Sequence, residues 1–259
     1  MALGGSYASG TNSFAAAIDN NTSSYGATGD NSVAIGLQAK ATTYGSLALG
    51  RFAGSTANYS IAIGYRTVAS GVGSVAIGNQ YYLGTPTASG SASIAIGDEA
   101  KATQKFSTAL GASSSSVIVG KYAYAGGEIS GHGDSQTGTL VLRKGTSDAT
   151  ATALTSNNST AGTTNQVILP NNSAFAFSGT IVARQQASGG TASAAWEIKG
   201  LIRREGSAGT TVLVNSATTV LDNTPAWGMA LTADTTNGGL AITVTGAAGT
   251  NIRWVATIN

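Results

Sequence analysis

The sequence contains no cysteine and only one histidine, His132, among its 259 residues. The lack of cysteine excludes a disulfide framework, thiolate zinc ligands and a cysteine nucleophile. A single histidine does not form a His-rich metal site, and no Gly-x-Ser-x-Gly motif accompanies it to suggest a serine hydrolase. We therefore expect no catalytic residue, no cofactor and no bound metal.

Charged and helix-forming residues are also scarce. Charged residues make up 9% of the chain, and 13 Lys and Arg against 11 Asp and Glu leave a net charge of +2. This balance predicts no binding to nucleic acid. No apolar run approaches the ~18 residues of a transmembrane helix and no signal peptide follows Met1, so we expect no membrane insertion. The 36 glycines, with abundant Ser, Thr and Ala, instead favour an all-β protein over long helices.

A five-residue phrase of the form Ser-Val-Ala-Ile-Gly recurs through the first half of the chain. Copies begin at Ser32, Ser46, Ser60, Ser74, Ser93 and Ser107, with a degenerate first copy at Ser13 and a looser last copy at Ser116. Most copies are 14 residues apart, and each of the two spacings of 19 is one period plus a five-residue insertion. Fourteen residues suit two short strands, each followed by a tight turn, which is one coil of a parallel β-roll.

Within each coil the phrase predicts the first strand, and small residues three and five places after its glycine predict the second. The glycine that closes each phrase, for example Gly36, is expected at a turn position with positive φ. Successive residues of a strand alternate between its faces, so Val33 and Ile35 point to one side and Ala34 to the other.

A coil this short has a narrow interior, which suits alanine and glycine better than β-branched side chains. The larger apolar side chains would then form a row on the outside of the roll, and an exposed row of that size requires a partner. Three rolls around a common axis would bury the row in a homotrimer; in the alternative, Val and Ile fill the interior of a monomer. The residues assigned to the trimer axis are Val33, Ile35, Leu47, Leu49, Ile61, Ile63, Val75, Ile77, Ile94 and Ile96.

The 14-residue repeat resembles the head repeat of trimeric autotransporter adhesins over roughly residues 13–120. The resemblance implies a left-handed parallel β-roll that trimerises. The heptad stalk, membrane-anchor strands and signal peptide of a complete bacterial adhesin are missing. We therefore expect either a fragment of such an adhesin or a borrowed module.

The second half contains about nine short, β-branched runs at intervals of 8–15 residues, separated by turn sequences. Asn237-Gly238 predicts a β-hairpin between two of these runs. The pattern predicts an antiparallel β-sandwich or jelly roll. The predicted divisions of the chain are a β-roll at 1–120, a junction at 121–138 and the β-sandwich at 139–259.

The second half is also similar to a module of bacteriophage tail-fibre and tailspike proteins. The similarity is collinear over residues 133–258 and includes Leu169-Pro170-Asn171-Asn172-Ser173, Ala233-Asp234-Thr235-Thr236-Asn237-Gly238 and Ile252-Arg253-Trp254-Val255-Ala256-Thr257. In that family the module is a structural or binding domain of a homotrimeric fibre, often placed after adhesin-like repeats. The resemblance implies a virion fibre made in the host cytoplasm.

The two insertions provide the candidate recognition residues, because insertions between repeats become surface loops. They contain tyrosines, which bind sugars and protein surfaces well, so Tyr25, Tyr81 and Tyr82 are the candidate receptor contacts. Packing against a neighbouring coil or subunit is the alternative for these rings. Trp227 and Trp254 are assigned to the sandwich core or to the trimer interface.

The ionisable residues are assigned structural roles. The closest acidic pairs are Asp98 with Glu99 and Glu197 with Glu205, and neither stands out as a glycosidase pair. Asp98-Glu99 follows a repeat glycine and is expected to be a solvated turn. His132 lies between glycines and is expected to be a polar linker residue rather than a metal or proton-transfer site.

These inferences predict host attachment by a non-enzymatic, homotrimeric bacteriophage fibre. Its partners would be a host-surface polysaccharide or protein and, at the N-terminus, other virion proteins. Three weak sites on one axis would bind by avidity. The alternatives are a purely structural virion or capsid fibre and a fragment of a bacterial surface adhesin. A depolymerase tailspike is disfavoured, because the roll is too narrow to form a carboxylate cleft within a coil.

Overall fold

The computed structural model describes residues 1–17, 22–81, 84–186, 192–223 and 225–259. The elements are β-strands apart from one short 3-10 helix, η1 (Ala208–Thr210), so the predicted all-β class is confirmed. Within the described ranges, no helix is long and apolar enough to cross a membrane. The chain divides into two units, residues 1–117 with 121–138, and residues 118–120 with 139–259.

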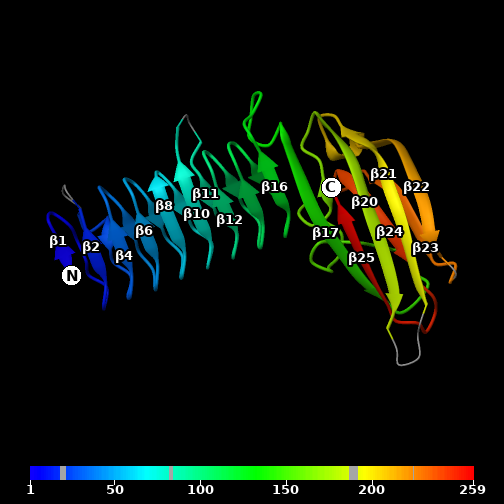
Figure 1. The fold of residues 1–259 in the computed structure, drawn as a ribbon, viewed down its shortest axis with the longest axis horizontal. Coiled ribbons are helices and arrows are strands. Elements are labelled where there is room, and N and C mark those ends of the chain that lie inside the picture. The colour runs from blue at the N-terminus through cyan, green and yellow to red at the C-terminus, as the bar shows by residue number, and fades with distance from the viewer. Residues whose placement is uncertain (18–21, 82–83, 187–191, 224) are drawn as a thin grey trace. The chain divides into compact units, whose positions relative to one another are not determined.

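The first unit is a parallel β-roll of stacked, two-stranded coils (Figure 1). Its first sheet contains, in spatial order, β1 (Ala2–Leu3), β2 (Phe14–Ala16), β4 (Val33–Ile35), β6 (Leu47–Leu49), β8 (Ile61–Tyr65), β10 (Val75–Asn79), β12 (Ile94–Ile96), β14 (Thr108–Leu110) and β16 (Tyr122–Ala125). Its second sheet contains β3 (Gly26–Ala27), β5 (Lys40–Ala41), β7 (Gly54–Ser55), β9 (Val68–Ala69), β11 (Thr87–Ala88), β13 (Lys101–Ala102) and β15 (Ser115–Ser116). The predicted roll of 14-residue coils is confirmed.

Alanine fills the interior of the roll. The repeats stack in register, so that Ala62 of β8 lies beside Ala48 on one side and Ala76 on the other. These three alanines are fully buried, as are Ala41 and Ala69 of the second sheet. The valine and isoleucine side chains on either side of each alanine point out of the roll. The alternative in which Val and Ile fill the interior of a monomer is therefore wrong.

The glycine of each phrase is required by both its backbone angle and a close approach. Gly64 has a φ of +123°, in the region that L side chains rarely adopt. A Cβ atom on Gly64 would lie 1.7 Å from the carbonyl oxygen of Gly78 in the next coil. The predicted positive φ is confirmed at each complete copy, namely Gly36, Gly50, Gly64, Gly78, Gly97 and Gly111.

Each phrase begins with a buried serine, and in most copies its hydroxyl group bonds to the preceding turn. Ser93 Oγ instead donates to the Ala102 carbonyl at 3.1 Å. Ser46 Oγ donates to the Thr43 carbonyl at 2.7 Å, and Ser60 Oγ donates to the Ala57 carbonyl at 2.6 Å. A buried polar group needs such a partner, and the turn carbonyl supplies it. The serine of the repeat is therefore a turn residue rather than a catalytic one.

The last coil differs from the sequence prediction in its register. The looser copy at Ser116–Gly120 is not a strand of the first sheet, and residues 118–120 group with the second unit. Instead, Tyr122 pairs with Thr108, so the coil continues through β16 in the segment expected to be a junction. The period of 14 from Ser107 falls on Lys121, and lysine in place of the repeat serine conceals this copy.

The second unit is an antiparallel β-sandwich. One sheet has the order β17 (Gln136–Thr146), β25 (Ile252–Ile258), β20 (Ser173–Gln185), β21 (Ser193–Arg204) and β22 (Val212–Asp222). In the other sheet, β24 (Gly239–Thr245) pairs with β18 (Thr152–Ala153), β19 (Val167–Ile168) and β23 (Gly228–Asp234). The hairpin predicted at Asn237-Gly238 joins β23 and β24 and is confirmed, with Gly238 at a φ of +81°.

Three tryptophans form the centre of the sandwich core. Trp254 is fully buried and stacks on Trp196 at 5.9 Å between ring centroids, and Trp227 lies 5.7 Å from it. The Trp254 indole Nε1 donates to Thr146 Oγ1 at 2.9 Å, which satisfies its buried polar atom. The sequence assigns Trp227 and Trp254 to the sandwich core or to the trimer interface, and the structure places both in the core.

Candidate functional site

The ten residues assigned to the trimer axis form two adjacent columns on the first sheet of the roll, and we call this surface the apolar row. In one column Ile61 lies between Leu47 and Val75, and the second column has the same register two residues later. Their side chains are partly exposed, with Ile35 at 36% and Leu49 at 39%. Neighbouring coils are ~4.8 Å apart, so the columns form a continuous apolar surface. The structure brings all ten residues together; whether they lie on a trimer axis stays a prediction.

A second cluster lies at the turn that follows the apolar row. It consists of Arg51, Phe52, Tyr65 and Arg66, the two residues after the repeat glycine in adjacent coils, and we call it the basic–aromatic cluster. The guanidinium carbon of Arg51 lies 4.7 Å from the Phe52 ring centroid and 5.7 Å from that of Tyr65. The corresponding distances for Arg66 are 5.3 and 5.5 Å. Both arginines therefore contact the same pair of rings.

The same turn position carries acidic residues farther along the roll. Asp98 accepts the backbone N–H of Tyr81 at 3.0 Å, and Glu99 Oε1 accepts that of Gly84 at 2.8 Å. The Glu99 side chain is only 5% exposed. The expectation of a solvated turn is therefore wrong for Glu99, because the Gly84 N–H and the His132 ring lie against its carboxylate.

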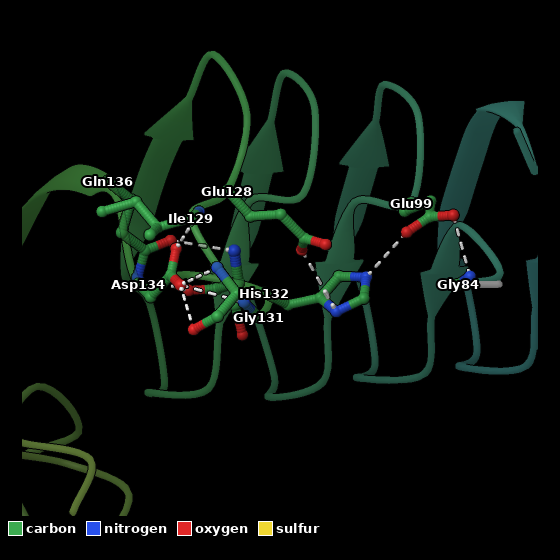
Figure 2. Close-up of polar contacts among 10 residues, drawn as sticks. Gly84, Glu99, Glu128, Ile129, Gly131, His132, Asp134 and Gln136 are labelled. Carbon is green, nitrogen blue, oxygen red and sulfur yellow. Dashed lines mark hydrogen bonds and ion pairs between the residues drawn. The ribbon is translucent and has the colours of Figure 1, made fainter. Parts of the chain in front are cut away.

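His132 lies between two carboxylates (Figure 2). Its Nε2 atom is 3.3 Å from Glu99 Oε2, and its Nδ1 atom is 3.8 Å from Glu128 Oε2. The Nε2 atom is buried and makes no directed hydrogen bond, so its contact with Glu99 is electrostatic in character. The expectation of a polar linker residue is wrong, since His132 is held against the roll.

Glu99, Glu128 and His132 are also the residues that could hold a metal, with ligand atoms within 4.8 Å of one another. The two ring nitrogens point in opposite directions, so one ion bonds only one of them. On the Nε2 side these residues offer one nitrogen and one carboxylate, whereas a zinc site takes three or four protein ligands. The geometry fits an imidazole between two carboxylates better than a chelated ion.

A carboxylate nest fixes the loop that carries His132. Asp134 accepts the backbone N–H groups of Ile129, Ser130 and Gly131 at 2.9, 2.7 and 2.9 Å. These bonds, led by that from Ile129, hold the pKa of Asp134 below its ordinary value. Figure 2 shows Asp134 and His132 on the same short loop. The loop is therefore ordered by its own hydrogen bonds as well as by Glu99.

The tyrosines predicted to contact a receptor differ in their exposure to solvent. Tyr81 is 74% exposed, whereas Tyr25 is partly buried, and Tyr82 lies outside the described residues. Sequence reasoning missed Tyr44 and Tyr59, which are exposed at the opposite turn with their rings edge to face at 5.5 Å. These two residues occupy regular repeats, so a search confined to insertions passes over them.

Three segments of the first unit match a known repeat family. Residues 27–53, 55–80 and 88–114 match the YadA head domain repeat. The resemblance to adhesin heads is confirmed for these residues. The YadA-like repeats are interrupted at residues 81–87, where the spacing of the serines predicts an insertion. No curated protein sequence matches the chain.

Solved tailspike structures share a weak similarity with the whole chain. The tailspike protein of Acinetobacter phage vB_ApiP_P1 is 11% identical with a TM-score of 0.26, covering 95% of this chain and 50% of its own. Tailspike gp49 of Acinetobacter baumannii bacteriophage Fri1, a capsular polysaccharide depolymerase, is 10% identical with a TM-score of 0.25, covering 95% and 44%. The Acinetobacter baumannii phage AM24 tailspike is 9% identical with a TM-score of 0.23, covering 95% and 42%. The chain thus spans about half the length of these proteins, or less.

Proposed function

We propose that this chain is a subunit of a homotrimeric, non-enzymatic bacteriophage fibre that attaches the virion to a host-surface polysaccharide or protein. The observation that carries the proposal is the apolar row on the outside of an alanine-filled roll. The interior needs no large side chains, so the regular recurrence of Val, Ile and Leu on the outer side favours a contact with another chain. The row of one chain can pack against the row of a second chain, because both rolls have the same spacing between coils.

The energy available from the row is substantial. Full burial of a Val, Leu or Ile side chain is worth about 1.5–3 kcal/mol, and roughly a third of each exposed member remains to be buried. Each side chain then contributes about 0.5–1 kcal/mol on assembly. Four members of the row have this exposure, namely Ile35, Leu49, Ile94 and Ile96, and the six less exposed members add smaller contributions. Together they favour a stable interface, and the resemblance to trimeric adhesin heads favours three copies.

The second unit offers another apolar surface for the same assembly. On the outer face of its five-stranded sheet, Val182 and Val255 are paired and about half exposed. Val141 and Leu201 add exposed apolar area on neighbouring strands. Exposed apolar side chains of this kind favour a contact with another chain. An assembly through both units would resist dissociation.

Attachment is favoured over a purely structural fibre by the turns of the roll. They carry exposed aromatic residues at Tyr44, Tyr59 and Phe106 and a pair of ring-stacked arginines, and aromatic rings with arginine are the typical anchors of binding surfaces. A shaft with no receptor has no use for such groups.

Adsorption to cells tests attachment directly. Fluorescently labelled protein is mixed with a panel of encapsulated bacterial strains and their capsule-free mutants, and cell-bound label is measured. We expect retention on at least one strain, reduced by excess unlabelled protein. Retention on none, or retention that excess protein does not reduce, would contradict attachment. In the same samples, release of reducing ends from the polysaccharide tests the absence of enzymatic activity, and we expect none above buffer.

The YadA-like repeats favour a second candidate, a bacterial surface adhesin fragment. Antibody labelling distinguishes the two locations. Gold label on purified virions supports the fibre, whereas label confined to the surface of uninfected bacteria supports the adhesin.

A further inference from the structure

The basic–aromatic cluster has the features of a preorganised anion site. Arg51 and Arg66 lie on adjacent coils, and the Arg66 backbone N–H donates to the Arg51 carbonyl at 3.0 Å. Phe52 and Tyr65 lie between them, with ring centroids 6.0 Å apart. Stacking on a ring holds a guanidinium group in place while its N–H donors in the plane stay available. The loss of side-chain entropy on binding is therefore small.

Neither arginine is neutralised by an acid. Among the described residues, the ion pairs join His132 to its two glutamates and Arg203 to Glu205. Arg66 donates only to the neutral Gln80 side chain, at 3.3 Å. Both arginines are exposed. Two like charges held beside the same rings repel each other, and a bound anion relieves that repulsion.

The surroundings of the cluster favour a sugar over a small anion. Aromatic rings offer an apolar surface to the C–H face of a pyranose, and the Tyr65 hydroxyl can bond to sugar hydroxyls. A guanidinium group binds a carboxylate through two parallel hydrogen bonds. The cluster lies at the turn beyond the apolar row, so a trimer that covers the row leaves these charged groups at its rim.

We propose that the basic–aromatic cluster binds carboxylate-bearing sugars of an acidic polysaccharide. This inference rests on the proposed attachment function and names the ligand class for it. The arginines bind the carboxylates and the rings support the sugar. Three copies in a trimer multiply a weak single site through effective concentration.

The test measures binding of the intact protein to three carboxylated polysaccharides, polygalacturonate, hyaluronate and polysialic acid. Neutral dextran and dextran sulfate are the comparison ligands. The variant Arg51→Gln with Arg66→Gln removes the two charges at exposed positions. The matched control, Lys101→Gln with Lys105→Gln, removes two positive charges from the same roll but from outside the cluster. Circular dichroism and molar mass establish that both variants keep the fold and assembly.

We expect the wild type to bind at least one carboxylated polysaccharide and not dextran. The arginine variant should bind about tenfold or more weakly, because two charge-assisted contacts are lost. The lysine variant should stay within about twofold of wild type, because its charges lie outside the cluster. Phe52→Leu should weaken binding by an intermediate factor, since it leaves Arg51 unsupported.

Four results would overturn the inference. These are no binding of any carboxylated polysaccharide, unchanged binding by the arginine variant, an equal loss in the lysine variant, and binding of dextran sulfate as tightly as carboxylated chains. If binding fails but labelled protein still adsorbs to cells, only the ligand class is wrong. If adsorption also fails, the attachment function is wrong as well.

Discussion

Replacement of a repeat glycine should be far more damaging than replacement of a turn glycine in the same roll. In Gly64→Ala the new Cβ lies 1.7 Å from the Gly78 carbonyl oxygen, and real Cβ contacts are not closer than 3.0 Å. The next coil must therefore move by at least ~1.3 Å. The adjacent bond from the Gln80 N–H to the Tyr65 carbonyl, 3.1 Å long, would be stretched beyond hydrogen-bond range by that shift.

The magnitude follows from two contributions. A left-handed backbone costs alanine roughly 1–2 kcal/mol, and each broken ladder hydrogen bond costs about 1 kcal/mol. Gly64→Ala should therefore lower the free energy of unfolding by roughly 3 kcal/mol. Gly73 provides the control, because its φ is +65° and a Cβ there meets nothing within 4 Å. Tyr59 and Ala92 already occupy the equivalent turn position, so Gly73→Ala should cost only the backbone contribution, about 1 kcal/mol at the lower end of that range.

The assay is urea unfolding followed by circular dichroism, with wild type and both variants at one protein concentration. The account predicts a clear fall in the midpoint for Gly64→Ala and a small one for Gly73→Ala. Equal midpoints for the two variants would refute the steric explanation. The coils would then have room for a side chain, and the recurrence of glycine at this position would need another explanation.

Three further predictions concern the assembly and the ionisable groups. Val75→Asp places a charge in the apolar row and should convert the assembly to monomers by molar mass, whereas Val72→Asp, at a turn residue outside the row and 54% exposed, should leave it intact. Burial lowers the pKa of Lys121 from 10.5 to about 8. The free energy of unfolding should therefore be lowest below pH 8, where the amine is charged in the folded protein, and should rise as the pH increases from 8 towards 10.5. This rise in the free energy of unfolding should be roughly 3 kcal/mol and should be absent in Lys121→Met. A wild-type free energy of unfolding that does not change between pH 8 and 10.5 would contradict the prediction. His132→Ala leaves the buried Glu99 carboxylate without its ring partner and should cost about 1–3 kcal/mol in urea unfolding. Glu128→Gln, which alters the more exposed partner of His132, should cost less than about 1 kcal/mol. Equal costs for His132→Ala and Glu128→Gln would argue against a stabilising contact between His132 and Glu99.

Repetition made the roll predictable from sequence. The 14-residue spacing fixes the register of every coil, and the alternation of Ala with Val or Ile specifies which face is inside. The prediction failed where the repeat changes its signal residue, because Lys121 stands where serine begins the other copies. The outward row followed from the narrow interior, since only small side chains, alanine and in places serine, occupy the space between the two sheets.

The ionisable groups were less predictable, because their contacts are between distant segments. Glu99 and His132 are 33 residues apart, and only the path of the loop brings the ring to the carboxylate. The basic–aromatic cluster, in contrast, had a usable signal. Arg51-Phe52 and Tyr65-Arg66 hold the same two positions in successive repeats, so stacking coils must bring them together.

The central claim is that the apolar row is buried between three copies of the chain. The most direct test is the molar mass of the purified protein in solution, by sedimentation equilibrium over a range of concentrations. The account predicts three times the chain mass of 25.5 kDa, independent of concentration. A mass of 25.5 kDa would contradict it, because the row would then be exposed to solvent with no partner.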